Sequence, residues 1–259
     1  MLSVFARSNA LVAFDFDGTL APIVRNPDEA CMRPQTKTLL KRLCSLYPCM
    51  VISGRSRLDV RSRLRGTALR YVIGNHGAEL GDTRKLRNLV SGWKALLAPA
   101  LAGFAGVWIE DKQLSLAIHY RQSSQKVGAR KKIFRLAQGL RGAKLIPAKQ
   151  ALNVIPKAAP HKGMALETLR TKLRCDTALY VGDDVTDEDV FSLKLPEGFL
   201  GIRVGVRRAS LARFCLYQQS EIDDLLRLLA ELRESSTSGH GKLLSPKHRN
   251  GTGLRAQAL

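Results

Sequence analysis

The chain of 259 residues has few aromatic side chains and no long uncharged apolar run. Trp, Tyr and Phe together make up 6% of the residues, and they form no base-stacking motif or recognition-helix pattern. No uncharged stretch approaches the roughly 18 apolar residues that a membrane span requires. We therefore expect neither specific recognition of nucleic acid nor a membrane protein.

Acidic residues are also scarce, with 22 Asp and Glu against 42 Lys and Arg and a formal net charge of +20. This excess is consistent with nucleic-acid binding, with attraction of small anionic substrates, or with an Arg-rich source proteome. Because the aromatic signals of nucleic-acid recognition are missing, we interpret the charge mainly as a field that steers anionic ligands.

Cysteines number five, and no pair of them has the spacing of metal ligands. Cys44 and Cys49 are too far apart for a C-x-x-C motif. The N-terminus lacks a basic flank followed by a long apolar run, so no signal peptide is expected. An odd set of cysteines without a secretion signal favours reduced thiols and a cytoplasmic protein.

Apolar strands alternate with helices in the first and last parts of the chain. Before residue 84, strands are predicted at 11–16, 49–52 and 69–73, and helices at 34–47 and 57–64. After residue 157, helices are predicted at 161–173 and 221–234, and strands at 177–181 and 200–204. Continuous apolar strands separated by helices are typical of an α/β fold with a parallel sheet covered on both faces.

The middle of the chain has a different order of elements. Helices are predicted at 93–104 and 126–140, and short strands at 106–109, 114–120, 143–146 and 151–155. This αββαββ order predicts a small α+β domain at 84–157, inserted into a core made of 1–83 and 158–234. Residues 235–259 are rich in Ser, Gly and basic residues, and we expect them to form a disordered tail.

Two acidic segments follow apolar strands directly. The first contains Asp15 and Asp17, and the second contains Asp183, Asp184 and Asp187. In an open parallel sheet, strand ends of this kind meet in one crevice. Single Asp residues often cap helices or form turns, but a cluster of carboxylates is costly without a cation. Oxygen ligands alone favour a hard ion, so we predict Mg²⁺ as the cofactor.

Asp15 and Asp17 are two residues apart, so an extended backbone directs both side chains to one side. One carboxylate can then attack phosphorus and become an acyl phosphate, while the other protonates the leaving oxygen. Gly18 allows the chain to turn sharply after them.

Donors for a phosphate group follow at two other positions. Ser53-Gly54-Arg55 comes after the second strand and offers a hydroxyl and backbone N–H groups. Lys162 precedes Gly163 at a predicted helix start and offers a point charge. Each is a weak signal alone, because such a turn or lysine is common, but together they complete one site.

In order along the chain, DFDGTL, SGR, HKG and GDDVTDED resemble the four motifs of the haloacid dehalogenase superfamily of phosphotransferases. The resemblance implies a Rossmann-like core, Asp15 as nucleophile and Asp17 as general acid and base. It implies that Ser53, Gly54 and Lys162 hold the phosphate. It further implies a magnesium site made by Asp15, the backbone carbonyl of Asp17, and Asp183, supported by Asp184 or Asp187.

The strings GNHGAEL, IEDKQLSLAIHYR and GDDVTDED more closely resemble trehalose-6-phosphate phosphatases, in which the inserted cap domain reads the sugar. The resemblance implies substrate-binding roles for Arg55, Asn75, His76, Glu110, Lys112, His119, Arg121, Asn153 and Glu188. Without it, Glu110 and Lys112 are typical of an exposed hairpin turn, and His119 of an ordinary sheet residue. Asn153 departs from the family, in which many members have Glu at this position.

The expected function is magnesium-dependent hydrolysis of trehalose 6-phosphate to trehalose and phosphate. The expected partner is a small-molecule sugar phosphate. Three alternatives remain open. They are the same chemistry on another sugar phosphate, such as sucrose 6-phosphate or a mannosyl phosphoglycerate; a phosphomutase; and a polyanion-binding protein that uses a decayed form of the fold.

Overall fold

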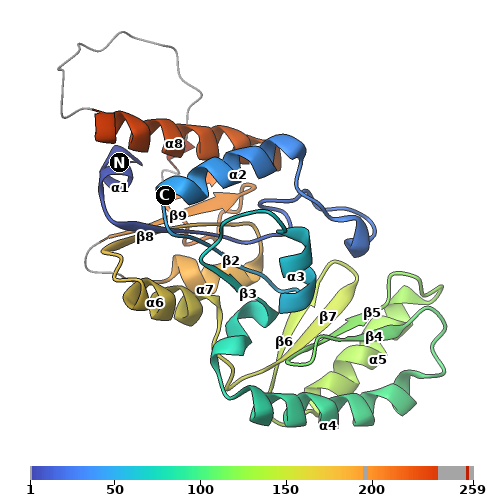
Figure 1. Cartoon of the computed structure of the whole chain (residues 1–259). Helices are drawn as coiled ribbons and strands as arrows, with labels where there is room; N and C mark the ends of the chain where they lie inside the picture. The colour runs from blue at the N-terminus through green and yellow to red at the C-terminus, as the bar shows by residue number, and fades with distance from the viewer. Residues whose placement is uncertain (1, 195–197, 239–254, 257–259) are drawn as a thin grey trace.

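The computed structural model describes residues 2–194, 198–238, 255 and 256, and Figure 1 shows them arranged around two separate sheets. The larger sheet has seven strands in the order β11-β10-β9-β8-β1-β2-β3, and the smaller has four in the order β4-β5-β7-β6. The predicted α/β class with an inserted αββαββ unit is confirmed. Among the described residues, no helix is long and apolar enough to cross a membrane.

The seven-stranded sheet brings distant segments of the chain together. β1 (Ala10–Phe14) lies between β2 (Cys49–Ile52) and β8 (Thr177–Gly182), and all three are parallel and completely buried. The other strands are β3 (Tyr71–Ile73), β9 (Phe199–Val204), β10 (Phe214–Leu216) and the antiparallel β11 (Arg255–Ala256). The carboxyl ends of β1, β2 and β8 therefore lie side by side, which positions the candidate site.

Helices cover both faces of this sheet (Figure 1). One face packs against α1 (Leu2–Arg7), α2 (Pro34–Leu46), α3 (Arg57–Arg63) and α8 (Ile222–Ser238). The opposite face packs against α6 (Lys162–Lys172) and α7 (Glu188–Phe191). Alternate residues of β1 point to the two layers, with Val12 in one core and Leu11 in the other.

The four-stranded sheet and two helices form the cap. They are α4 (Thr83–Leu101), β4 (Trp108–Asp111), β5 (Leu116–His119), α5 (Lys126–Gln138), β6 (Ala143–Ala148) and β7 (Ala151–Pro156). One face of the sheet packs Ile118 and Leu152 against Trp93 of α4 and Ile133 of α5. Full burial of such a side chain contributes about 1.5 to 3 kcal/mol to stability. The opposite face, which carries His119, is left to line a pocket.

Several predicted boundaries are wrong. α4 begins ten residues before the predicted start at 93, because the Asp82 side chain caps the helix by accepting the Lys85 N–H. α8 continues to Ser238 rather than ending at 234, so the first four residues of the predicted tail are helical. Two further tail residues pair with β10 as β11, and the other predicted tail residues lie outside the described part of the chain.

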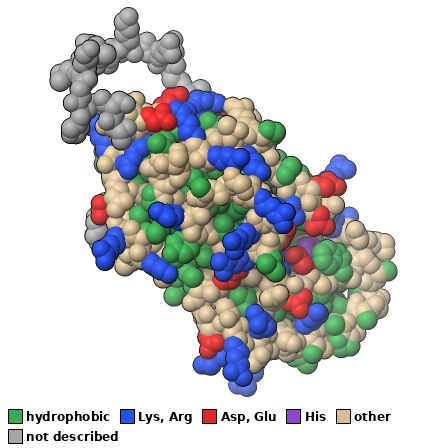
Figure 2. Space-filling view, in the orientation of Figure 1, with side chains coloured by type: hydrophobic (Ala, Val, Ile, Leu, Met, Phe, Trp, Pro, Cys, Tyr) green, Lys and Arg blue, Asp and Glu red, His purple; other side chains and the backbone are tan. Residues whose placement is uncertain are grey.

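Charge is distributed unevenly along the sequence. Between residues 84 and 157 there are 15 Lys and Arg but only two acidic residues, Glu110 and Asp111. In the view of Figure 2, Lys and Arg side chains (blue) lie on both the core domain and the cap. The cap is therefore a strongly positive cover for a site whose base is acidic.

Candidate active site

Asp15 lies directly after β1 at the base of a pocket between the two sheets. The pocket has a volume of about 320 Å³ and is lined from both the strand ends of the larger sheet and the cap. Asp15 is 5% exposed, and its Oδ1 accepts a hydrogen bond from the Phe16 N–H at 2.7 Å. The carboxylate is therefore fixed in place and still borders the pocket.

Carboxylates from both acidic segments meet at this base. One oxygen from each of Asp15, Asp183 and Asp187 lies within 4.8 Å of the others. Gly18 makes this approach possible, because a Cβ there would lie 2.0 Å from Asp183 Oδ2, and its φ of +78° also favours glycine. The pairing of β1 with β8 brings the two segments together, as the sequence predicts.

Lys162 is the main cation among these carboxylates. It is the first residue of α6 and is 1% exposed, and its Nζ lies 3.1 Å from Asp15 Oδ2 and 2.8 Å from Asp187 Oδ1. Asp187 also accepts hydrogen bonds from the Tyr180 hydroxyl at 2.6 Å and the Asp184 N–H at 2.8 Å. Asp187 is thus fully bonded and does not line the pocket, so it holds Lys162 in place.

Burial and mutual repulsion change the protonation of this cluster. Burial raises the pKa of Asp15 well above its usual range; Lys162 opposes this shift, and the neighbouring carboxylates add to it. Burial, followed by the charge of Asp187, raises the pKa of Asp183 to about 7. For Lys162, burial disfavours the charge, but Asp15 and Asp187 outweigh it, so its pKa is raised. The ionised carboxylates are therefore left short of positive charge.

This donor set fits a hard divalent cation. Three carboxylates share one ammonium group, all the ligand atoms are oxygens, and the pocket gives access to them. Asp15, Asp17, Asp183 and Asp184 all border the pocket, although Asp184 also accepts the Val185 N–H at 2.6 Å. Asp187 would support such an ion from behind.

Asp17 borders the pocket with its carboxylate bound to Arg55. Arg55 Nε and Nη2 donate to the two carboxylate oxygens at 2.7 Å each, a bidentate pair. Arg55 is held in turn by Asp59 Oδ2 at 2.7 Å and the Pro27 carbonyl at 2.8 Å. Asp59 is a supporting residue that sequence reasoning missed, although its place in the first turn of α3, four residues before Arg63 with which it also pairs, is a readable signal.

The turn after β2 and the turn after β3 pack against each other. Ser53 is buried, and its Oγ accepts the Arg55 N–H at 3.2 Å, so its own O–H can still donate. Gly54 and Arg55 line the pocket, whereas Ser53 lies just behind it. Gly54 is required by close contact, since a Cβ there would lie 2.5 Å from the His76 ring.

His76 is a buried imidazole at the edge of the pocket. Burial, then the charges of Lys162, Lys112 and Lys144, lower its pKa well below the usual range, so the ring is neutral. Its Nδ1 is buried and has no hydrogen-bond partner among the described residues. Asn75 does not line the pocket, and its Oδ1 accepts a hydrogen bond from Ser115 of the cap at 2.9 Å. Asn75 therefore connects the two domains.

The cap supplies the opposite wall of the pocket. The predicted cap residues that line it are Glu110, Lys112, His119, Arg121 and Asn153. His119 Nε2 lies 2.9 Å from Glu110 Oε2, and Lys112 Nζ lies 3.8 Å from the same oxygen. Lys112 also donates to the Gly54 carbonyl at 3.3 Å, and Arg121 donates to the Arg25 carbonyl. The wall is thus in direct contact with the core domain.

Comparison of the sequence with models of protein families identifies the family of the chain. The family model described as trehalose-phosphatase matches residues 13–213, which include the acidic segments, Lys162 and the cap. The chain belongs to the trehalose-phosphatase family.

Similar proteins in this family come from bacteria and plants. The chain is 31% identical over 247 residues to a trehalose-phosphate phosphatase of Mycobacterium tuberculosis H37Rv, covering 86% of this chain and 62% of that protein. It is 30% identical over 272 residues to a probable trehalose-phosphate phosphatase of Oryza sativa, with 90% and 71% covered. The chain thus spans less than two thirds of the length of its mycobacterial relative.

Solved structures show the same fold. A trehalose-6-phosphate phosphatase related protein superposes with a TM-score of 0.70 at 25% identity, over 87% of this chain and 99% of that one. A haloacid dehalogenase-like hydrolase from B. subtilis has a TM-score of 0.55 at 15% identity, over 84% and 98% of the two chains. The fold of the trehalose-phosphatase family thus extends to this wider group of hydrolases.

Glu188, like Asn75, is a predicted substrate-binding residue that does not line the pocket. Glu188 Oε1 pairs with Arg203 at 3.0 Å, and its Oε2 accepts the Leu211 N–H at 2.8 Å. Arg203 in turn donates to the backbone carbonyl of Asp183. Glu188 therefore supports the strand end that carries Asp183.

Other pocket residues had no signal in the sequence. Ile23, Val24 and Pro27 from the segment after β1 line it, as do Ala148 at the end of β6 and Lys149 in the turn that follows. Their types are ordinary for loops, and only the fold of the whole chain brings them to the same pocket.

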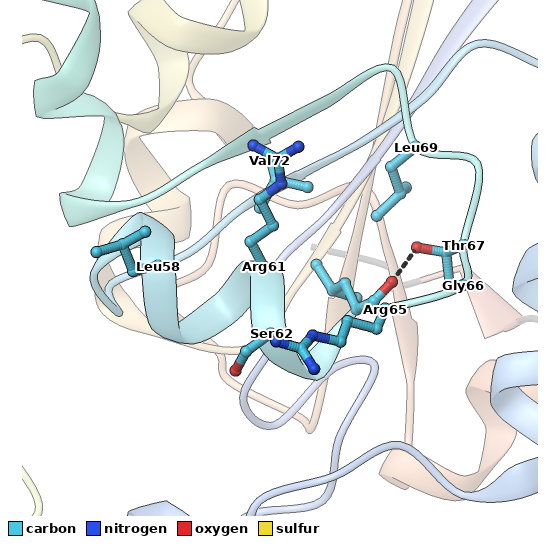
Figure 3. A pocket seen from close by; sticks show the side chains of 9 residues that line it. Leu58, Arg61, Ser62, Arg65, Gly66, Thr67, Leu69 and Val72 are labelled. Atoms are coloured by element: carbon cyan, nitrogen blue, oxygen red, sulfur yellow. Dashed lines mark hydrogen bonds between the residues drawn. The ribbon is translucent and has the colours of Figure 1, made fainter.

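A second pocket of about 390 Å³ lies beside α3 and β3 (Figure 3). Arg61 of α3 and Val72 of β3 border it, and the Thr67 hydroxyl donates to the Leu64 carbonyl at 2.6 Å. The described residues that line it include no carboxylate, so it does not compete with the acidic pocket as a catalytic centre.

Proposed function

We propose that this chain is a magnesium-dependent phosphatase that hydrolyses trehalose 6-phosphate through an aspartyl-phosphate on Asp15. The observation that carries the proposal is the buried Asp15 carboxylate at the base of a pocket, between the Lys162 ammonium and the Asp183 carboxylate. Family membership and the sugar-compatible cap wall support it.

The first step of the proposed reaction is attack of an Asp15 carboxylate oxygen on phosphorus. The bond from phosphorus to the sugar oxygen breaks, and Asp17 protonates that oxygen as trehalose leaves. Asp17 must leave its pair with Arg55 and take up a proton before it can do so. In the second step Asp17 accepts a proton from a water molecule, whose oxygen attacks phosphorus. Phosphate is released and Asp15 is restored.

The reaction also needs cations and hydrogen-bond donors around the phosphate oxygens. Lys162, the Ser53 hydroxyl and the Gly54 backbone would bind these oxygens and offset their charge. Mg²⁺, held by Asp15, Asp183 and the backbone carbonyl of Asp17, would supply further charge neutralisation, with Asp184 and Asp187 in support.

The cap wall would bind the sugar. Glu110 accepts hydrogen bonds from hydroxyl groups, and Lys112 and Arg121 donate to them. Asn153 borders the same wall and can do both, but without charge. Since Asn153 departs from the family pattern, the exact sugar is the part of the proposal that most needs a test.

We also propose that the catalytic core consists of 1–83 and 158–234, with a cap at 84–157, and that the protein acts in the cytoplasm. The two sheets support the division, since their strands fall on either side of these boundaries. The odd number of cysteines favours a reducing compartment.

Phosphate release from a panel of substrates tests the proposed activity. We expect kcat/KM to be highest for trehalose 6-phosphate, above sucrose 6-phosphate, glucose 6-phosphate and para-nitrophenyl phosphate, and to depend on Mg²⁺. A clearly higher value for another sugar phosphate would replace trehalose 6-phosphate as the substrate. Transfer of the phosphate to another position of the sugar, without release, would indicate a phosphomutase.

Metal binding is expected to stabilise the fold in a pH-dependent way. The pKa of Asp183 rises from 3.8 to about 7 on folding, so the metal-free protein loses stability as pH rises through this interval. Mg²⁺ binds the ionised carboxylates. A Mg²⁺ concentration of 100 times the Kd at pH 8 should therefore add about 2.7 kcal/mol to the free energy of unfolding at pH 8, or roughly 5 to 11 °C in Tm. The same concentration should add much less at pH 5.

Thermal unfolding with and without Mg²⁺ at the two pH values measures this effect. Asp183→Asn is the matched variant, and it should remove most of the Mg²⁺-dependent shift at pH 8. Equal shifts at pH 5 and pH 8, or a full shift in Asp183→Asn, would contradict the proposed metal site.

A further inference from the structure

Trp108 has an unusual position for a tryptophan. It is the first residue of β4, at the edge of the cap sheet, and it is 46% exposed. The other tryptophan, Trp93, is 3% exposed in the cap core and donates its indole N–H to the Arg141 carbonyl. Trp108 does not belong to the core of the cap, which contains Trp93, so core packing does not account for its position.

Trp108 covers one face of the His119 imidazole. Their ring centroids lie 4.0 Å apart and their planes differ by 14°, so the rings are stacked. The two residues are directly opposite each other in the antiparallel β4–β5 pair. Rotation of an imidazole about its last torsion is normally broad. A stacked indole restricts it to one plane.

The restriction of the His119 ring also limits the orientation of the pocket wall, because His119 contacts Glu110. The His119 Nε2 lies 2.9 Å from Glu110 Oε2, which also lies 3.8 Å from Lys112 Nζ. Glu110, Lys112 and His119 line the pocket, whereas Trp108 does not. Trp108 and Glu110 are two residues apart on β4 and so share one face of the sheet. The stack therefore supports the wall from outside the pocket.

We propose that Trp108 is a positioning residue for sugar recognition. By stacking on His119, it holds the His119–Glu110 pair in the orientation that presents the Glu110 carboxylate to the sugar hydroxyls. This inference rests on the proposed function, because it assigns the cap wall to the sugar. Trp108 does not line the pocket that holds Asp15 and Asp17, so loss of the indole should weaken substrate binding rather than phosphoryl transfer.

A double-mutant cycle on Trp108 and His119 tests this inference. Trp108→Ala should raise KM for trehalose 6-phosphate about 2- to 12-fold, the range for loss of an aromatic pair, with kcat changed less than about twofold. Trp108→Phe should restore most of the loss. In a His119→Ala background, Trp108→Ala should change KM by less than about twofold, because the residue through which it acts is gone.

Leu96→Ala is the matched control, since Leu96 is a 67% exposed apolar residue of α4 in the same domain. It should leave both KM and kcat unchanged. An equal rise in KM from Trp108→Ala with and without His119 would overturn the inference, because Trp108 would then act independently of the stack. An unchanged KM in Trp108→Ala would also overturn it.

Para-nitrophenyl phosphate separates this inference from a folding defect and from the proposed function. It has no sugar, so Trp108→Ala should lower its kcat/KM less than about twofold. An equal loss on both substrates would show damage to the fold and overturn the inference. If the wild type hydrolyses para-nitrophenyl phosphate but not trehalose 6-phosphate, the proposed substrate fails. The cycle is then decided on the sugar phosphate with the lowest KM.

Discussion

Asp15→Asn is expected to lower kcat by about 10⁴-fold or more, because it removes the proposed nucleophile and leaves an amide that does not form an acyl phosphate. The protein should remain folded. Burial and the neighbouring carboxylates raise the pKa of Asp15, so its ionised form is a cost to the metal-free fold at pH 8. A neutral amide removes that cost, while Lys162 keeps its 2.8 Å contact with Asp187.

Phosphate release and thermal unfolding measured on the same sample separate these two effects. Asp28→Asn is the matched control, because its side chain is 92% exposed, and it should retain full activity. In the wild type, mass spectrometry of an acid-quenched reaction should locate a phosphoryl group on the peptide that contains Asp15. Substantial Mg²⁺-dependent turnover in a folded Asp15→Asn protein would reject Asp15 as the nucleophile.

The meeting of the two acidic segments could be predicted because it depends on few facts. β1 and β8 are continuous apolar runs that end in Asp15 and Asp183, and parallel strands place such ends in one crevice. The αββαββ order of the cap was readable for a similar reason. Strand alternation and helix periodicity are local patterns, and the domain's elements are short and well separated.

The orientation of Asp187 could not be read from the sequence in the same way. A capping box between Asp184 and Asp187 forms a tight turn after β8, and this turn directs the Asp187 carboxylate inward to Lys162 and Tyr180. The acidic string itself does not distinguish a carboxylate that faces the pocket from one that faces the core. Glu188 illustrates the same limit, since only the position of Arg203 on β9 explains where its carboxylate lies.

The stack of Trp108 on His119 could not be predicted from the sequence, because it depends on the cross-strand register. The two residues are eleven positions apart, and they become opposite only when the hairpin between β4 and β5 fixes which residues pair. The start of α4 was missed for a local reason. Residues 83–92 include several charged residues and Gly92, so their helical signal is weak, and the Asp82 cap decides the boundary.

Lys162→Met is expected to cause the largest loss of stability among single substitutions at the site. Lys162 is 1% exposed and lies between the carboxylates of Asp15 and Asp187. Removal of one partner from a buried ion pair costs about 3 to 5 kcal/mol, because the remaining charge is left unpaired. For a domain of this size we expect Tm to fall by roughly 6 to 20 °C.

The pH dependence of this loss identifies its cause. Without the ammonium, nothing opposes the burial and the neighbouring charges that raise the pKa of Asp15, so Asp15 is protonated and tolerated at pH 5 but ionised and destabilising at pH 8. The gap in Tm between Lys162→Met and the wild type should therefore widen as pH rises. Adding Asp187→Asn to Lys162→Met should recover part of the loss, whereas Lys131→Met on the exposed surface of α5 should change stability by less than about 0.5 kcal/mol. A gap that is independent of pH would mean that Lys162 contributes through packing of its side chain rather than through its charge.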